Sequence, residues 1–283
     1  MKAERLYVDQ LDRISLTTDD ILGKSIAVLG IKGYGKSNTA AVLIEEMLRT
    51  GIPVCVVDPA GEYWGLKEKY KLFVIGQSLN KQPGAVDATL GADKAAKAAE
   101  RSYRKGVSVI LDVSGFKSLA EREDFLYQYF MTIWTLAATL RQPYVIVLEE
   151  ARNFVPQSGR TSISDVMVDI TCEGRKRGLG VVLVGQRSSQ IDKNVLTQCD
   201  LLFLHYASHP TDVKIYMDQM AMPFKQARLA IQKLKVGEAL VVQGEQTNWC
   251  KIRRRTTPDR GFTPTMDDLP KERGMDSVQG LLL

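Results

Sequence analysis

Residues 30–37 read Gly-Ile-Lys-Gly-Tyr-Gly-Lys-Ser, and this stretch decides the fold. It matches the phosphate-binding pattern G-x-x-x-x-G-K-[ST] at every fixed position. Glycines let successive backbone N–H groups turn toward a phosphate, where a Cβ would block the turn or the approach. The lysine can reach the β- and γ-phosphates, and the serine hydroxyl can hold Mg²⁺. The candidate nucleotide-binding residues here are Ile31, Lys32, Gly33, Tyr34, Gly35, Lys36, Ser37 and Asn38, with Ser37 also a candidate metal ligand.

The sequence on either side of the loop strengthens this prediction. Residues 26–29 form a short apolar run typical of a buried strand, and apolar residues after the loop recur at helical spacing. Strand, loop and helix therefore follow in the order that a phosphate loop requires. A glycine-rich turn with an incidental lysine is the alternative, and the flanking pattern argues against it. We predict a protein that binds ATP with Mg²⁺.

From residue 23 onward, short β-rich runs alternate with helical patterns, which predicts an α/β fold with a mostly parallel sheet flanked by helices. We expect strands at 26–30, 54–58, 107–113, 145–149, 181–185 and 201–205, and helices near 36–50, 92–104, 119–141 and 161–177. A C-terminal hairpin is expected at 239–243 and 249–253, with 244–248 as its turn. We divide the chain into an N-terminal lead-in (1–22, with one short strand at 6–8), an ATPase domain (23–255) and a C-terminal tail (256–283). The tail is either disordered or an arm that packs on a neighbouring subunit.

The composition narrows the class of protein. The 283 residues are 45% hydrophobic and 25% charged, as in ordinary globular proteins. We find no apolar run of membrane-spanning length and no signal peptide, so we expect a cytoplasmic protein. Four scattered cysteines favour reduced thiols over a zinc site, and the two histidines, His205 and His209, favour structural roles. A net charge of +5 is compatible with a polyanionic partner.

Two carboxylates, Glu149 and Glu150, directly follow the apolar run 144–148. A strand buried on both faces cannot keep a charge in its middle, so acids at its carboxyl end should face the ligand crevice of the sheet. In an enzyme with a phosphate loop the first acid contacts Mg²⁺, and the second can accept a proton from the attacking water. The alternative is a pair of exposed acids that opens a turn. We predict Glu149 as a metal ligand and Glu150 as the catalytic base of hydrolysis.

Three further groups of residues are weaker candidates. Asp58 and Glu62 follow the strand at 54–58 and can lie beside the γ-phosphate, or Asp58 can simply cap a turn. Gln186 directly follows the strand at 181–185, where it can sense the γ-phosphate, orient water or be a polar loop residue. The cations in 173–178 close a helix, where they complement its dipole; the sharper hypothesis is an arginine finger that enters a neighbour's ATP site.

These residues together carry a family resemblance. The chain resembles the HerA/FtsK superfamily of ring-forming DNA-pumping ATPases, and more closely its HerA-like branch. The similarity covers most of residues 17–255 and rests on an ordered set of motifs at 29–38, 58–63, 147–156, 173–180, 186–189 and 237–241. The sequence departs from the family pattern in Lys32 and Tyr34 within the loop and in Glu149, where Asp is usual.

The resemblance implies a RecA-like ATPase core, a hexameric ring with ATP sites between subunits, and a central channel for duplex DNA. It assigns Lys36 and Ser37 to phosphate and Mg²⁺, and Glu150 and Gln186 to catalysis. Arg175 matches the family's trans arginine finger, with Arg177 as the second choice. We also expect a minimal ATPase core without the β-barrel that precedes it in full-length HerA proteins.

The leading hypothesis is therefore an ATP-driven translocase on duplex DNA that serves packaging, end processing or defence. The basic residues 251–255 are a candidate DNA contact, and a solvated face is the alternative. A rival hypothesis is an ATP-gated hexameric scaffold that assembles with a nuclease or other effector and moves little DNA itself. A small-molecule kinase is disfavoured because Glu150 and Arg175 suit hydrolysis.

Overall fold

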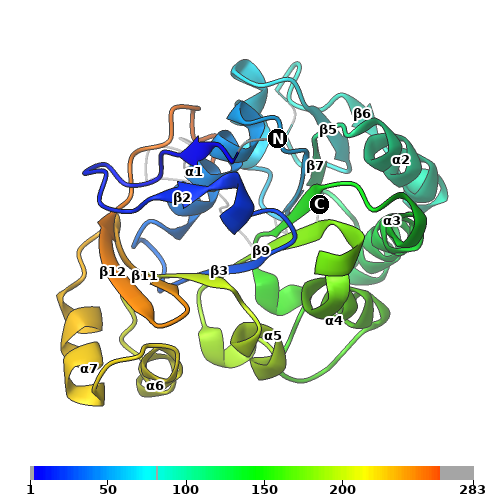
Figure 1. Cartoon of the computed structure of the whole chain (residues 1–283). Helices are drawn as coiled ribbons and strands as arrows, with labels where there is room; N and C mark the ends of the chain where they lie inside the picture. Colours follow the sequence, from blue (N-terminus) through cyan, green and yellow to red (C-terminus); the bar gives the residue numbers. More distant parts are fainter. Residues whose placement is uncertain (1–2, 81, 262–283) are drawn as a thin grey trace, which may run out of the picture.

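A mixed β-sheet runs through the molecule, with helices on both of its faces (Figure 1). The computed structural model describes residues 3–80 and 82–261. The strands of this sheet are β3 (Ser25–Leu29), β4 (Val54–Asp58), β5 (Phe73–Gly76), β6 (Ala88–Thr89), β7 (Val109–Asp112), β8 (Tyr144–Leu148), β9 (Leu179–Gly185), β10 (Leu201–Leu204), β11 (Glu238–Gln243) and β12 (Gln246–Lys251).

The strand order within the described residues is β12-β11-β10-β3-β9-β8-β4-β7-β5-β6. All neighbours are parallel except β10–β11 and β11–β12. The inner strands are continuous runs of β-branched and other apolar residues, as expected where helices cover both faces. Strand β9 separates β3 from β8, with Leu29 opposite Gly185 and Leu183 opposite Leu148. The segments that follow these three strands therefore meet at one edge of the sheet.

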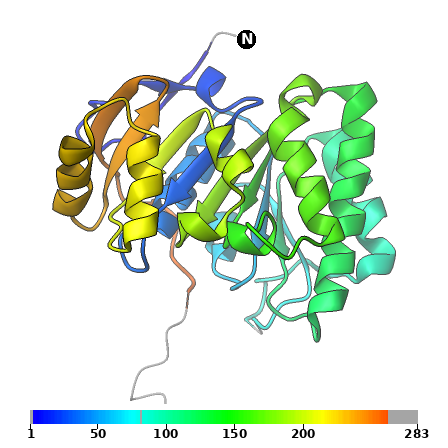
Figure 2. The ribbon, with the colours of Figure 1, turned by 90° about the horizontal axis from the view of Figure 1, so that it is seen from below.

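The helices and short strands divide between the two faces. Residues 26 and 28 of β3 pack toward α1 and the N-terminal strands, whereas residues 27 and 29 pack toward α2, α3 and α4. Figure 2 looks onto the sheet from the side of α4 and α5, with α6 and α7 beside the last strands. The bounds are α1 (Lys36–Arg49), α2 (Ala92–Lys105), α3 (Leu119–Leu140), α4 (Ser162–Glu173), α5 (Lys193–Thr197), α6 (Pro210–Asp218), α7 (Phe224–Lys233), β1 (Arg5–Leu6) and β2 (Leu16–Thr17). None of the helices in the described ranges is long and apolar enough to cross a membrane.

The predicted fold class is confirmed, and all six predicted inner strands are present with ends that shift by at most two residues. The short strands β2, β5 and β6 and the helix α5 were not predicted. The helix expected at 161–177 ends at Glu173 and continues as a 3-10 turn, η4 (Gly174–Arg177). Gly174 packs so closely on Leu179 that an added Cβ would lie 3.1 Å from it, which makes room for the turn into β9.

The predicted hairpin is present with a shorter turn. Its second strand begins at Gln246 rather than Trp249, so that only residues 244 and 245 form the turn. Gly244 has a φ of +57°, which allows a two-residue turn. The misjudged residues 246–248 are polar because β12 is an edge strand with an exposed face.

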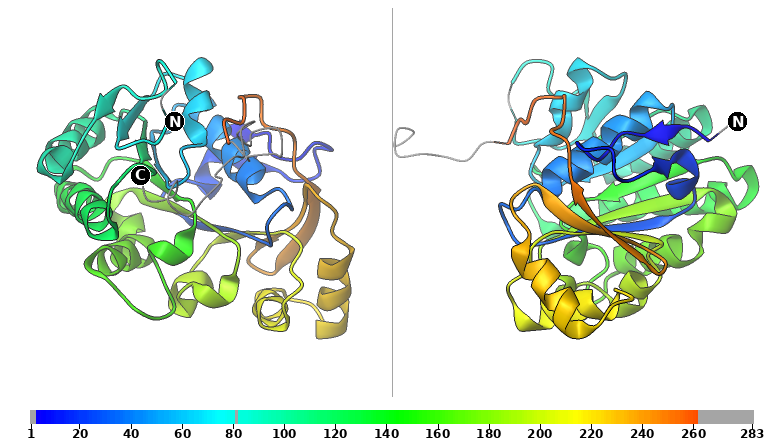
Figure 3. Two further views of the ribbon diagram at one scale, coloured as in Figure 1. Left: turned by 180° about the vertical axis from the view of Figure 1, so that it is seen from behind. Right: turned by 60° about the vertical axis from the view of Figure 1, so that its left-hand side comes forward.

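Two segments that are far apart in the sequence both pack on α1. The lead-in carries β1 and β2, and its buried residues join the core formed by α1. On the other side, residues 253–261, which we call the strap, leave β12 and cross α1. Figure 3 shows the lead-in and the strap close together over this face of the sheet. Residues 262–283 of the predicted tail lie outside the described residues.

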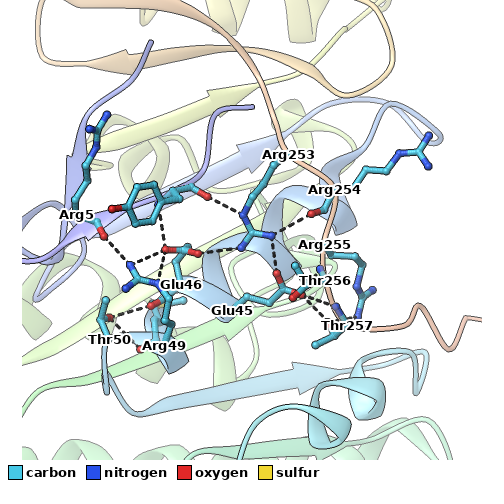
Figure 4. Close-up of polar contacts among 12 residues, drawn as sticks. Arg5, Glu45, Glu46, Arg49, Thr50, Arg253, Arg254, Arg255, Thr256 and Thr257 are labelled. Carbon is cyan, nitrogen blue, oxygen red and sulfur yellow. Dashed lines mark hydrogen bonds and ion pairs between the residues drawn. The ribbon is translucent and has the colours of Figure 1, made fainter. Parts of the chain in front are cut away.

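Two buried acids of α1 hold the strap in place (Figure 4). Glu45 Oε1 accepts hydrogen bonds from the backbone N–H groups of Thr256 and Thr257 at 2.7 and 2.8 Å, and Glu45 Oε2 accepts one from Arg253 Nη1 at 2.7 Å. Glu46 receives Arg253 Nη2 at 3.0 Å and the backbone N–H of Tyr7 at 3.0 Å. Burial raises the pKa of Glu45, but these hydrogen bonds outweigh burial and hold the pKa below its usual 4.5. Glu45 is thus ionised and fully engaged.

Glu45→Ala is expected to lower the free energy of unfolding by about 3 kcal/mol, because it leaves Arg253 and two backbone N–H groups without their buried acceptor. Urea denaturation followed by circular dichroism measures this. Glu100→Ala is the control, since it breaks an exposed pair with Arg104 and should cost less than about 0.5 kcal/mol. A Glu45→Ala loss no larger than that of the control would contradict the anchoring role.

Candidate active site

The phosphate loop joins β3 to α1 at the carboxyl edge of the sheet. Gly33 and Gly35 have φ values of +85° and +100°, which favour glycine. Gly30 has no room for a side chain, because an added Cβ would lie 2.5 Å from the Cβ of His205. Lys36 is buried and its Nζ donates to the Ile31 carbonyl at 3.0 Å. Burial lowers the pKa of Lys36, while the charges of Glu149 and Glu150 oppose that shift.

Ser37 and Glu149 lie against each other, as predicted for a shared magnesium site. Ser37 Oγ donates to Glu149 Oε1 at 3.3 Å, and the Tyr63 hydroxyl donates to Glu149 Oε2 at 2.9 Å. Burial raises the pKa of Glu149 to about 7. A hydroxyl and a carboxylate are hard oxygen ligands of the kind Mg²⁺ prefers, so the two residues fit that ion. Tyr63 was not predicted, because its contact links the turn after β4 to the end of β8 and leaves no local signal.

Glu150 and Gln186 are also brought together. Gln186 Nε2 donates a hydrogen bond to Glu150 Oε1, and Arg152 Nε lies 3.5 Å from Glu150 Oε2. Glu150 has a φ of +55°, an uncommon backbone conformation for a residue other than glycine and one that recurs at functional sites. Adjacent strand ends explain the Glu150–Gln186 contact, whereas Arg152 was not foreseen.

Asp58 adopts its turn-capping alternative. Its Oδ1 accepts from the backbone N–H of Gly61 at 2.8 Å, and its Oδ2 accepts from the backbone N–H of Tyr63 at 2.8 Å. Burial, reinforced by the nearby carboxylates of Asp112 and Glu149, raises the pKa of Asp58 to about 7. Asp58 therefore shapes the turn that presents Glu62 and Tyr63, and both of its oxygens accept hydrogen bonds from the backbone of that turn.

Three other predicted residues of the loop region have different surroundings. Lys32 is exposed at the tip of the loop. Tyr34 stacks on Tyr206 with ring centroids 4.6 Å apart. Asn38 does not offer its side chain to a nucleotide, because its Nδ2 donates to the Arg253 carbonyl at 2.8 Å and its Oδ1 accepts from the Arg255 N–H at 3.0 Å. The side chain of Asn38, predicted as a nucleotide-binding residue, ties the strap to the first turn of α1.

The two candidates for the arginine finger, Arg175 and Arg177, lie in different surroundings. Arg177 lies 3.4 Å from the ring centroid of Trp134 and donates to the Trp134 carbonyl at 2.9 Å, so it is committed to packing. Arg175 is exposed beside Gly23, where the chain enters β3. It lies in η4, before β9, and so at the opposite sheet edge from the phosphate loop. Arg175 therefore points to solvent on a face away from this chain's own site.

The basic residues 251–255 do not form the predicted DNA-binding strand. Strand β12 ends at Lys251, and Arg253 turns inward to Glu45 and Glu46. Arg255 is also largely buried, with a side chain one-tenth exposed. The strap therefore runs along α1, where Arg253 pairs with the buried acids Glu45 and Glu46 and is not available to solvent or DNA.

His205 packs against the phosphate loop, in keeping with the structural role predicted for it. Its Nδ1 lies 2.8 Å from the Glu238 carbonyl and its Nε2 lies 2.9 Å from Thr39 Oγ1. Burial lowers the pKa of His205 to about 4. The ring is therefore neutral at pH 7, with Nδ1–H donating to Glu238 and Nε2 accepting from Thr39. This pairing holds the first turn of α1 against β11.

This lowered pKa makes stability depend on pH. An unfolded histidine binds a proton below about pH 6.5 and folded His205 does so only near pH 4, so its contribution to stability is lost as pH falls through this window. We expect His205 to remove about 2 kcal/mol of unfolding free energy between pH 7.5 and pH 5. Asp58 and Glu149 titrate with the opposite sign, so the test compares variants by urea denaturation at both pH values. His205→Asn should lose this dependence and His209→Asn, at an exposed site, should keep it; equal slopes would contradict the assignment.

The fold and this arrangement of residues define a P-loop ATPase. Residues 6–110 match the family model described as "Helicase HerA, central domain". The chain is 23% identical over 332 aligned positions to a probable helicase, MJ1565, of Methanocaldococcus jannaschii, which covers 86% of this chain and 64% of that protein. It is 30% identical over 103 positions to the DNA double-strand break repair helicase HerA of Saccharolobus solfataricus, which covers 36% of this chain and 21% of the relative. Over residues 6–110 the chain is thus similar to the central domain of HerA helicases, and it spans less than two thirds of the length of these relatives.

Solved structures share the fold at low sequence identity. The genome packaging NTPase B204 of Sulfolobus turreted icosahedral virus 2, in complex with AMPPCP, has a TM-score of 0.55 and 17% identity over 81% of this chain and 97% of that one. VirB4 of Thermoanaerobacter pseudethanolicus has a TM-score of 0.62 and 14% identity over 89% of this chain and 97% of that one.

Proposed function

We propose that this ATPase is a ring-forming motor that moves duplex DNA at the expense of ATP and Mg²⁺. The observation that carries the proposal is the pairing of Glu150 with Gln186 beside the Ser37–Glu149 contact at the phosphate loop. This arrangement suits hydrolysis rather than storage of a bound nucleotide. The similarity to proteins named as a HerA helicase and as a genome packaging NTPase supports DNA as the polymer along which this motor moves.

In the proposed reaction the chain mainly positions groups and stabilises charge. Backbone N–H groups of residues 33–37 and the Lys36 ammonium bind the phosphates. Ser37 and Glu149 would hold Mg²⁺, which neutralises charge that develops on the β- and γ-phosphate oxygens. Glu150 accepts a proton from the attacking water, and Gln186 fixes the carboxylate of Glu150 in place.

The position of Arg175 supports a ring, and we propose a hexamer. Arg175 lies at the opposite sheet edge from its own phosphate loop, so it can complete an ATP site only if the neighbouring chain is stacked head to tail. Head-to-tail contacts between identical chains close into rings when the rotation permits. The ring then places one finger at each ATP site.

A direct test is steady-state ATP hydrolysis with and without long linear duplex DNA, at 50 and 200 mM salt, with the particle mass measured in parallel. We expect a ring-sized particle whose hydrolysis is stimulated several-fold by DNA at the lower salt, because phosphate contacts weaken as salt rises. A ring whose hydrolysis ignores DNA would contradict the motor and favour an ATP-gated scaffold for a nuclease or other effector.

A further inference from the structure

The strap buries an arginine whose hydrogen-bond donors are largely unused. The Arg255 side chain is only 10% exposed, yet its Nε has no acceptor anywhere in residues 3–80 and 82–261. Its other contacts are long, at 3.7 Å from Nη1 to Asp259 Oδ1 and 3.5 Å from Nη2 to Thr257 Oγ1. Burying a cation without close acceptors costs free energy, so an anion that fills the gap would be bound strongly.

The neighbouring arginines, Arg253 and Arg254, do not share this combination of burial and unused hydrogen-bond donors. Arg253 is saturated by close contacts to Glu45 and Glu46, and Arg254 is exposed. Figure 4 shows the three consecutive arginines directed to different surroundings, with Arg254 pointing away from the acids. The strap therefore assigns one arginine to the framework, one to solvent, and one, Arg255, to a buried position with an unused donor.

Arg255 lies next to the phosphate loop and to the turn after β4. The backbone N–H of Arg255 is held by Asn38, the residue after Ser37. Its guanidinium carbon lies 5.9 Å from the ring centroid of Tyr63, whose hydroxyl donates to Glu149. The positive charges of Arg255 and of Lys32 at the tip of the loop both act on Glu62. Arg255 thus belongs to the same charged group as the phosphate loop.

We propose that Arg255 is a nucleotide-binding residue supplied in cis by the strap, with its guanidinium donating to a phosphate oxygen of bound ATP, an inference that rests on the ATP site proposed above. The planar fork of a guanidinium matches phosphate geometry, and hydrogen bonds to a charged oxygen are the strong ones. The strap then connects nucleotide occupancy to the end of the ATPase domain, because Arg253, Arg255 and Thr257 share one short segment.

The alternative is that Arg255 serves only as a counter-ion for the acids around Glu62 and Asp58. The two roles differ in the nucleotide-free protein. A structural counter-ion stabilises the empty fold, so its removal lowers the melting temperature. A cation that waits for a ligand costs stability when the site is empty, so its removal leaves the melting temperature unchanged or raises it.

The experiment measures two quantities on the full chain: the dissociation constant of ATPγS with Mg²⁺ by titration calorimetry, and the melting temperature without nucleotide. Arg255→Gln should weaken ATPγS binding about 10- to 100-fold without lowering the melting temperature. Arg255→Lys should recover part of the affinity because it keeps the charge. Arg254→Gln is the matched control, with the same loss of charge on the next residue, and should change neither quantity.

Two results would overturn the assignment: ATPγS affinity of Arg255→Gln within twofold of wild type, or a melting temperature without nucleotide that falls by several degrees. Either result leaves the ATP site itself intact. Wild-type protein that fails to bind ATPγS would instead contradict the proposed ATP site, so the two failures are distinguishable.

Discussion

Glu150→Gln is expected to reduce the turnover number for ATP about 10²- to 10⁴-fold and to leave ATP binding unchanged. Glu150 follows β8 at the sheet edge that carries the phosphate loop, and Gln186 holds its Oε1. Its Oε2 receives no hydrogen bond from the described residues, with Arg152 Nε 3.5 Å away, and is the oxygen that we expect to accept the proton of the attacking water. A glutamine amide has nearly the same shape but cannot take the proton.

Phosphate release and ATPγS binding, measured on the same preparation, test this prediction. Glu100→Gln, which neutralises an exposed acid on α2, should change neither quantity. Gln186→Ala should reduce turnover less than Glu150→Gln, because it releases the carboxylate without removing it. Normal turnover by Glu150→Gln would show that another group activates the water.

Arg175→Ala is expected to reduce turnover about 10³-fold or more while sparing both ATP binding and stability, because an arginine finger stabilises charge that develops only in the transition state. Arg175 is exposed and distant from its own phosphate loop, so we expect its removal to slow hydrolysis at the ATP site of the neighbouring chain. Lys176→Ala removes an exposed cation from the same turn and should leave turnover nearly unchanged. Arg177→Ala should instead lower the unfolding free energy by about 1–2 kcal/mol, since it loses its stacking on Trp134.

Mixing two inactive variants separates a trans role from a cis role. A ring that contains Arg175→Ala and Glu150→Gln chains includes interfaces where an intact Glu150 meets an intact Arg175. Such mixtures should recover a measurable fraction of wild-type hydrolysis, whereas each variant alone stays inactive. No recovery in mixtures that demonstrably co-assemble would remove the support for a trans finger at Arg175.

The sequence predicted the parts of the site that follow from strand ends. A phosphate loop after β3, acids after β8 and Gln186 after β9 must meet, because carboxyl ends of parallel strands share one edge. Glu150 and Gln186 were predicted separately, and the order of their strands explains why they lie in contact. The roles of Asp58 and Asn38 were harder to judge, because a carboxylate or amide near a phosphate loop can bind either a ligand or the chain's own backbone.

The contacts missed by sequence reasoning join segments that are far apart in the chain. Tyr63 meets Glu149 across 86 residues, and His205 meets Thr39 across 166. Neither pair has a local pattern, and each depends on where a loop finally packs. The strap shows the same difficulty: its run of basic residues suggested a solvated or DNA-binding face, while two buried acids of α1 determine its course.

The ion pair between Glu45 and Arg253 can form only late in the synthesis of the chain. The two residues are 208 positions apart, so at roughly 5–20 residues per second the ribosome needs roughly 10–40 s to supply the second after the first. During that interval Glu46 can pair with Arg49 of the same helix, but Glu45 lacks its arginine and Asn38 lacks its strap. The phosphate loop is therefore translated well before the strap that completes its surroundings.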